Sequence, residues 1–200
     1  AGHVVSQDSI GVHVMNVSYN AGPGYNAPRK GWKVRLDVYN ELERRDITNV
    51  LGVIRGKEEP DRYVIIGCHY DAWTYGAIDP GSGTAILLEL AKAYGEMKQK
   101  GWRPRRTMLF VAWDGEEQGL LGSYEFVEEH QGELADRAIA YVNLDVAVRG
   151  NFTLNVQASP LLHALIMNTT KMFPSATNDE SIYDVWTRNA PSADDDDIPD

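Results

Sequence analysis

Six residues in the middle of the chain carry the side chains of a hydrolytic metal centre. They are His69, Asp71, Asp79, Glu116, Glu117 and Asp145. One ring nitrogen of His69 can bind a metal, while Asp71, two residues later, can accept the N–H of the other nitrogen and orient the ring. Asp79 supplies a second carboxylate after a short loop. Residues 69–71 therefore contain a candidate metal ligand, His69, and a carboxylate that can orient its ring, Asp71.

The adjacent residues Glu116 and Glu117 can divide two tasks. Because neighbouring side chains diverge, one carboxylate can bind a metal while the other accepts a proton from a bound water. Asp145 follows an apolar run, the usual position of a ligand at the carboxyl end of a buried strand. Zinc takes such nitrogen and oxygen donors and keeps an open position for water in catalytic sites. The set suits a hydrolase with two zinc ions bridged by a carboxylate.

Each of these residues also has an ordinary structural interpretation. A histidine at a strand end often serves packing, adjacent glutamates often form a solvated pair, and an aspartate before proline often forms a turn. The ordered set favours the metal centre, because the candidate acids follow apolar, strand-like runs.

Three apolar runs would position these side chains. They cover residues 62–68, 107–113 and 138–144, and they precede His69, the glutamate pair and Asp145. Residues 82–97 have helical apolar spacing, and Ser159-Pro160 is typical of a helix start. Strands that alternate with helices indicate an α/β sandwich, with the ligands at one edge of an open sheet.

Composition and charge bound the class of protein. The 200 residues are 43% hydrophobic with a net charge of −10, which fits a folded domain and argues against nucleic acid as a partner. Cys68 is the only cysteine, so no disulfide forms within the chain. Sequons at Asn16, Asn151 and Asn168 point to secretion and glycosylation. No apolar run reaches the roughly 18 residues of a membrane helix.

Three segments of the chain carry a family resemblance: HYDAWTYGAIDPGSG, RPRRTMLFVAWDGEEQGLLGS and AYVNLDVA. They resemble the catalytic core of the M28 zinc metallopeptidase family, most closely its glutamate carboxypeptidase II (prostate-specific membrane antigen) branch. The similarity runs from about Tyr19 to about Trp186. The resemblance implies an α/β three-layer sandwich with a mixed, largely parallel sheet. It assigns residues 1–43 to the end of an apical, protease-associated domain and 44–190 to the N-terminal part of the peptidase domain. The crowded aspartates of residues 191–200 predict a flexible acidic tail.

The resemblance also gives the six residues roles. The zinc ligands would be His69 and Asp145 on one ion, Glu117 on the other, and Asp79 between them. Glu116 would be the general base, and Asp71 would orient His69. The family's second zinc uses a further histidine well beyond Asp145. Because the only later histidine, His163, has the helical surroundings of a packing or surface residue, we expect a fragment with little activity of its own.

Further expectations follow from the same branch. Glu125 and Glu128, three residues apart on one helix face, would bind a structural calcium. The parent would be a homodimeric type II membrane protein, with its anchor upstream of Ala1 and an extracellular catalytic domain acting on peptides.

Function and substrate leave alternatives open. The resemblance implies hydrolysis of a terminal peptide bond, as in release of a C-terminal glutamate. Asn155 stands where acid-selective members carry an arginine, and an amide cannot offer a carboxylate the same charged, bidentate contact. An M28 aminopeptidase or dipeptidase without acidic preference therefore remains open. A transferrin-receptor-like, non-catalytic homologue is a third alternative, against which the retained zinc ligands argue.

Overall fold

The structure is a computed structural model that describes residues 35, 37–41, 43–148, 150, 153–176 and 178–189. The chain divides into two compact units, Ala1–Arg45 and Asp46–Asp200. This division lies close to the boundary expected after residue 43, but the assignment of 1–43 to an apical domain stays a prediction. The acidic tail at 191–200 and the sequons at Asn16 and Asn151 fall outside the described residues.

Strands and helices alternate through the second unit. They are β1 (Val50–Ile54), β2 (Glu59–His69), α1 (Gly81–Gln99), β3 (Arg106–Trp113), α2 (Leu121–Glu129), α3 (Gln131–Arg137), β4 (Ala138–Asn143), α4 (Pro160–Met172) and α5 (Ile182–Asn189). Among the described residues, four strands form one sheet in the order β1-β3-β2-β4. The β2 strand is parallel to β3 and β4, and β1 is antiparallel to β3. The predicted mixed, largely parallel α/β sheet is confirmed.

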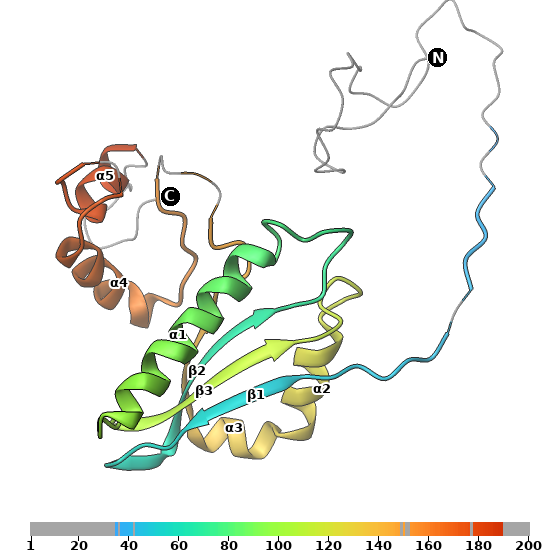
Figure 1. Cartoon of the computed structure of the whole chain (residues 1–200), viewed down its shortest axis with the longest axis horizontal. Helices are drawn as coiled ribbons and strands as arrows, with labels where there is room; N and C mark the ends of the chain where they lie inside the picture. Colours follow the sequence, from blue (N-terminus) through green and yellow to red (C-terminus); the bar gives the residue numbers. More distant parts are fainter. Residues whose placement is uncertain are drawn as a thin grey trace, which may run out of the picture. The chain divides into compact units, whose positions relative to one another are not determined.

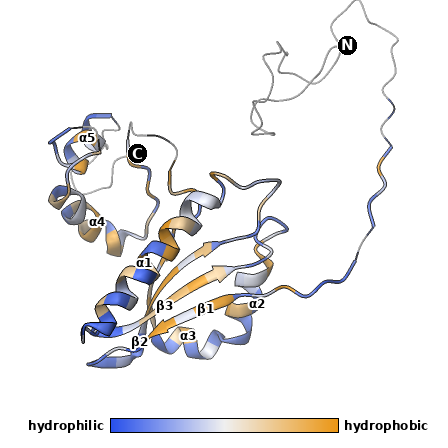
Figure 2. Cartoon of the chain, viewed as in Figure 1, coloured by the Kyte–Doolittle hydropathy of each residue, from blue (hydrophilic) through white to orange (hydrophobic). Residues whose placement is uncertain are grey.

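Alternate residues of β2 and β3 build two separate cores. On the α1 face, Ile66 and Phe110 pack with Leu87 of α1. On the other face, Leu109 and Trp113 pack with side chains of α2 and α3. Because successive strand residues point to opposite faces, continuous apolar runs bury both faces of these strands. The result is a helix–sheet–helix sandwich (Figure 1), and its strands are largely apolar (Figure 2).

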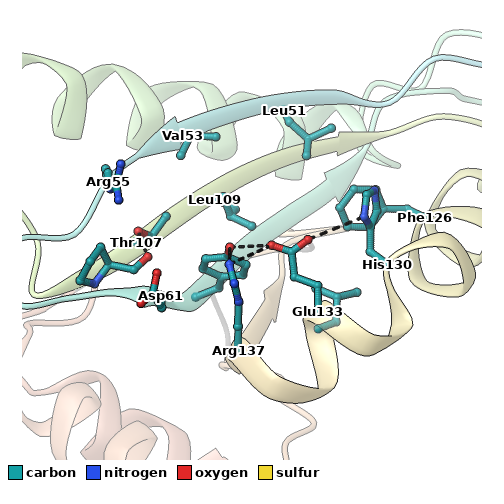
Figure 3. Close-up of a pocket in the computed structure, with 13 residues that line it drawn as sticks. Leu51, Val53, Arg55, Asp61, Thr107, Leu109, Phe126, His130, Glu133 and Arg137 are labelled. Carbon is teal, nitrogen blue, oxygen red and sulfur yellow. Dashed lines mark hydrogen bonds and ion pairs between the residues drawn. The ribbon is translucent and has the colours of Figure 1, made fainter.

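A polar network fixes α3 to the first half of β2. Tyr63 donates its hydroxyl proton to Glu133 at 2.7 Å, and Arg137 donates to the Tyr63 oxygen at 2.9 Å. These three side chains line a hollow of about 390 Å³ (Figure 3), whose other walls include Leu51 and Val53 of β1. None of the six candidate site residues lines this hollow, so we assign its polar network to holding the helix.

The predicted elements match the observed ones closely. The helix expected over 82–97 is α1, and the helix expected after Ser159 begins at Pro160, although the Ser159 side chain makes no capping hydrogen bond. Helices α4 and α5 pack against each other. No helix in the described part of the chain is both long and apolar enough to cross a membrane.

Gly67 is the glycine of β2 that the sheet packing requires. A Cβ there would meet the Tyr141 hydroxyl and would lie 2.7 Å from Nε1 of Trp113. We expect Gly67→Ala to lower the free energy of unfolding by about 1–3 kcal/mol through overpacking. Gly95→Ala is the control, because Gly95 lies inside α1 with no atom within 4 Å of its Cβ position. That change should raise the free energy of unfolding by about 0.5–1 kcal/mol.

Urea unfolding, followed by tryptophan fluorescence, measures both variants. Equal urea midpoints for Gly67→Ala and the unsubstituted protein would contradict the close packing of Tyr141 and Trp113 against Gly67.

Candidate active site

Three parallel strands end at one edge of the sheet and deliver the candidate residues there. His69 is the last residue of β2, the turn with Glu116 and Glu117 follows β3, and Asp145 comes two residues after β4. Since β2 pairs with both β3 and β4 in parallel, the carboxyl ends of all three strands lie together. The convergence expected from the sequence is present in the structure.

His69, Asp79 and Asp145 place three metal-binding atoms close together. Nε2 of His69 lies 3.1 Å from Oδ1 of Asp79 and 3.4 Å from Oδ1 of Asp145. The donor atoms of these residues lie within 4.8 Å of one another, and no other group of three or more His, Cys, Asp or Glu side chains in the described ranges is so arranged. One imidazole nitrogen with two carboxylate oxygens is a donor set that zinc accepts. The residues therefore fit a zinc ion.

The His69 ring is held on its far side by the backbone of Asp71. Nδ1 of His69 lies 3.0 Å from the carbonyl oxygen of Asp71 and 3.5 Å from its carboxylate. A proton on Nδ1, donated to that carbonyl, leaves the lone pair of Nε2 directed at the metal-binding group. The sequence led us to expect the carboxylate in this role, but the closer contact is with the backbone.

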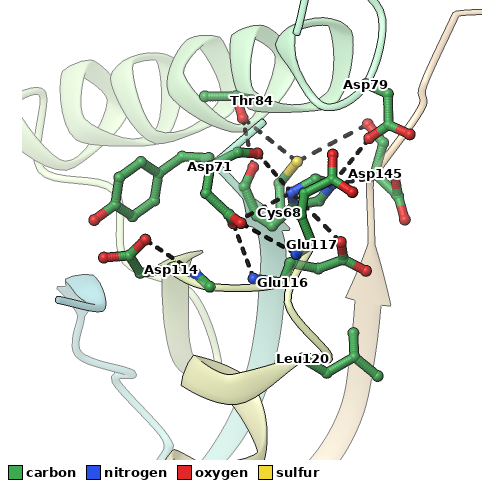
Figure 4. Close-up of polar contacts among 12 residues, drawn as sticks. Cys68, Asp71, Asp79, Thr84, Asp114, Glu116, Glu117, Leu120 and Asp145 are labelled. Atoms are coloured by element: carbon green, nitrogen blue, oxygen red, sulfur yellow. Dashed lines mark hydrogen bonds and ion pairs between the residues drawn. The ribbon is translucent and has the colours of Figure 1, made fainter. Parts of the chain in front are cut away.

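The Asp71 carboxylate instead holds the turn that carries the two glutamates. It accepts the backbone N–H of Glu116 at 3.0 Å and that of Glu117 at 3.1 Å (Figure 4). The Glu117 side chain in turn accepts the backbone N–H of Trp73 at 3.2 Å. The loop after β2 and the turn after β3 are thus joined by reciprocal hydrogen bonds, which fix Glu116 beside His69.

Glu116 has the environment of a proton acceptor. Its carboxylate is half-buried and lies 3.9 Å from the His69 ring. Burial raises the pKa of Glu116, and the positive charge of a protonated His69 lowers it. The negative charges of Asp145, Glu117 and Asp71 raise the Glu116 pKa further. For His69, burial alone would lower the pKa, but the charges of Glu116, Asp145 and Asp71, together with the contact to the Asp71 carbonyl, raise it overall. A carboxylate with a raised pKa is a better base toward water.

Asp114 and Asn49 also shape the turn, and the sequence reasoning missed both. Asp114 accepts the backbone N–H of Thr48 at 2.9 Å and that of Gly115 at 2.9 Å. Asn49 donates to the carbonyl of Gly122 at 2.8 Å and accepts the N–H of Asp114. An Asp-Gly pair is a local turn signal, whereas the contacts with residues 48 and 49 span more than sixty positions and leave no mark in the local pattern.

Two hollows meet at the metal-binding group. One, of about 510 Å³, is bordered by His69, Glu116 and Asp145 and is otherwise mostly apolar, with Phe126 among its walls. The other, of about 690 Å³, is bordered by Asp79 and Asp145 and also by Asn155. Asp145 borders both hollows.

Other candidates lie apart from this centre. Glu125 and Glu128 are exposed on α2, and neither belongs to a metal-binding group among the residues described. His163 is half-buried on α4, with Nε2 3.2 Å from the carbonyl of Ala158. Asn168, the one described sequon residue, is exposed on α4. Buried Cys68 lies behind His69, with Sγ 3.6 Å from the Thr84 hydroxyl.

Comparison with known proteins agrees with this fold. Residues 49–199 match the model of Peptidase family M28. The chain belongs to that family. It is 46% identical over 180 residues to the rat (Rattus norvegicus) protein "Aminopeptidase NAALADL1", covering 87% of this chain and 24% of that protein. It is 42% identical over 198 residues to the Caenorhabditis briggsae "Glutamate carboxypeptidase 2 homolog", covering 96% of this chain and 25% of that protein.

A solved structure shows the same fold. A zinc aminopeptidase from Bacillus subtilis superimposes with a TM-score of 0.50 at 26% identity, over 62% of this chain and 31% of that one. The chain spans about a quarter of the length of the curated relatives it matches. The expected M28 membership and its glutamate carboxypeptidase relatives are confirmed.

The two hydrogen bonds that the Asp71 carboxylate accepts from the backbone of Glu116 and Glu117 can be tested by mutation. In Asp71→Asn the amide group would turn an N–H toward one of the two backbone N–H groups, so one donor loses its acceptor. We expect the free energy of unfolding to fall by about 1–3 kcal/mol. Asp136→Asn is the matched control, since Asp136 is exposed at the end of α3.

The free energies of both variants can be measured in urea. An Asp71→Asn protein as stable as its control would show that the carboxylate does not hold the turn.

Proposed function

We propose that this chain carries the principal metal-binding and proton-transfer residues of a zinc exopeptidase that hydrolyses a terminal peptide bond. The observation that carries the proposal is the group formed by His69, Asp79 and Asp145, with the Glu116 carboxylate beside it. Membership of Peptidase family M28 supports the same reaction class. Because the chain spans only part of its relatives, the activity is proposed for the parent protein.

Zinc, when bound, would lower the pKa of a bound water and polarise the scissile carbonyl. His69 would bind through Nε2, with its ring orientation set by the Asp71 carbonyl. Asp145 would share that ion, and Asp79 would bridge to a second zinc. Glu117 would be the chain's own ligand for the second ion, alongside a donor supplied from elsewhere in the parent.

Glu116 would move the proton in this scheme. Its raised pKa suits a group that takes a proton from water and returns it to the departing nitrogen. The Asp71 carboxylate would keep Glu116 in place through the backbone of the turn. Trp73 N–H would hold the neighbouring Glu117 carboxylate in a separate direction, so the two acids keep separate tasks.

The substrate is a peptide with a free end, and two specificities are candidates. Release of a C-terminal residue such as glutamate is supported by the relatives named as glutamate carboxypeptidase homologues. A less acid-selective aminopeptidase or dipeptidase is supported by the neutral Asn155 in the hollow beside Asp79 and Asp145, and by the relative named as an aminopeptidase.

The parent protein would have further features of its branch. Glu125 and Glu128 would contribute to a structural calcium site, completed by residues outside the described ranges. Asn168 is exposed and accessible to glycosylation, and Asn16 and Asn151 are further candidates. We place the parent as a homodimer anchored in the cell membrane as a type II protein, with an extracellular catalytic domain. Peptides, and not nucleic acids, would be its substrates.

The role of Glu116 is tested by removing only its charge. Glu116→Gln in the full-length protein should lower kcat on dipeptides by about 10²–10⁴-fold, because the amide cannot take up a proton. Zinc content, measured by atomic emission, should stay near that of the unsubstituted protein. Glu129→Gln, on the exposed surface of α2, is the control and should leave kcat unchanged. Turnover that survives Glu116→Gln would remove Glu116 from the mechanism.

A further inference from the structure

The first turn of α1 touches all three backbone segments that carry the zinc-binding group. The Thr84 hydroxyl donates to the carbonyl oxygen of His69 at 2.7 Å. The Ser82 hydroxyl donates to the carbonyl of Ile78 at 2.7 Å and accepts the backbone N–H of Ala147 at 3.1 Å. Thr84 thus contacts the backbone of one ligand, while Ser82 connects the Asp79 loop to the loop of Asp145.

Gly83, between the two hydroxyl residues, allows the helix to touch the Asp145 loop. A Cβ at this position would meet the carbonyl oxygen of Asp145 and would lie 2.8 Å from the carbonyl oxygen of Leu144. The backbones of α1 and the loop are therefore in direct contact. Asp145 itself has φ of 23°, a value that residues with side chains rarely adopt. Such a conformation persists only where surrounding contacts impose it.

The Thr84 hydrogen bond is not the usual local bond of a helical threonine. Its acceptor, His69, precedes it by fifteen residues and lies at the end of β2. Thr187 of α5 shows the local alternative, since its hydroxyl donates to the carbonyl of Tyr183, four residues earlier, at 2.9 Å. Both threonines are half-buried. They form a matched pair that differs in the acceptor of the hydroxyl hydrogen bond, which is distant in sequence for Thr84 and local for Thr187.

From these contacts we infer that Ser82 and Thr84 are positioning residues that set the separation of the zinc-binding atoms of His69 and Asp145. Neither hydroxyl is assigned as a metal ligand; each acts through the backbone of the segment that it holds. Ligand distances in metal sites lie within about 0.2 Å of their standard values, so we expect a small shift of either segment to weaken binding. The inference rests on the proposed function, because it assumes that these residues bind zinc.

Zinc affinity of the full-length protein is the measurement, made by competition with a chromophoric chelator. Thr84→Val keeps the shape of the side chain and removes the donor, and it should weaken zinc binding by about 10–100-fold, the usual loss when an outer partner of a metal ligand is removed. Thr84→Ser keeps the hydroxyl and should restore most of the affinity. Thr187→Val should leave zinc affinity at the level of the unsubstituted protein.

Ser82→Ala is the second variant and should also weaken zinc binding, with recovery in Ser82→Thr. If circular dichroism shows that Thr84→Val fails to fold, the zinc affinity of Ser82→Ala tests the positioning role instead. The visible spectrum of the cobalt-substituted protein adds a direct readout: it should change in Thr84→Val and Ser82→Ala, and stay the same in Thr187→Val.

The outcomes separate the two proposals. If the unsubstituted protein binds zinc and cleaves dipeptides while folded Thr84→Val and Ser82→Ala variants bind zinc equally well, the positioning role is wrong and the proposed function stands. If the unsubstituted full-length protein binds no zinc, the proposed function fails, and the positioning role fails with it.

Discussion

The parallel pairing of β2 with β3 on one side and β4 on the other is the constraint on which the site depends. In the register, His69 lies opposite Trp113 and Gly67 lies opposite Asn143, so all three strands end at nearly the same level. The segments that follow these strands must then start side by side. His69, Glu116 and Asp145 therefore lie close together, although they are far apart in the chain, and each lies at or just after the end of its strand.

Hydrogen bonds between the segments turn this proximity into a defined geometry. The loop after β2 holds the turn after β3 through Asp71, and the first turn of α1 holds the β2 end and the Asp145 loop through Thr84 and Ser82. The centre gathers several carboxylates around one imidazole, and the pKa values of both Glu116 and His69 are raised there. A cation offsets the mutual repulsion of such carboxylates, so the clustered negative charges favour metal binding.

Much of this arrangement could be predicted from the sequence. The apolar runs before His69 and Asp145 and the helical spacing after Asp79 predicted β2, β4 and α1, because continuous apolar runs and helical apolar spacing are typical of these elements. The run before Asp145 suggested a buried strand, whereas β4 is mostly exposed in the structure. The convergence of the acids followed from their positions after strand-like runs, since such strand ends meet at one edge of an open sheet. The break between α2 and α3 at His130 and the antiparallel β1 were not predicted, since both depend on tertiary packing.

The contacts of single side chains were harder to predict. Asp71 was expected to bind the His69 ring through its carboxylate, yet its closer contact is through the backbone, and the carboxylate serves the turn forty-five residues later. Thr84 carried no signal, because a threonine in the first turn of a helix has many ordinary roles. Such long-range bonds depend on where the strands bring the backbone, which residue types alone do not encode.

The most direct test of the central claim is the position of the metal. Crystals of the zinc-loaded full-length protein, measured on both sides of the zinc absorption edge, give an anomalous difference map. The account predicts a peak about 2.0–2.2 Å from Nε2 of His69 and from a carboxylate oxygen each of Asp79 and Asp145. A map with no peak at this group, or with zinc bound only elsewhere, would contradict it.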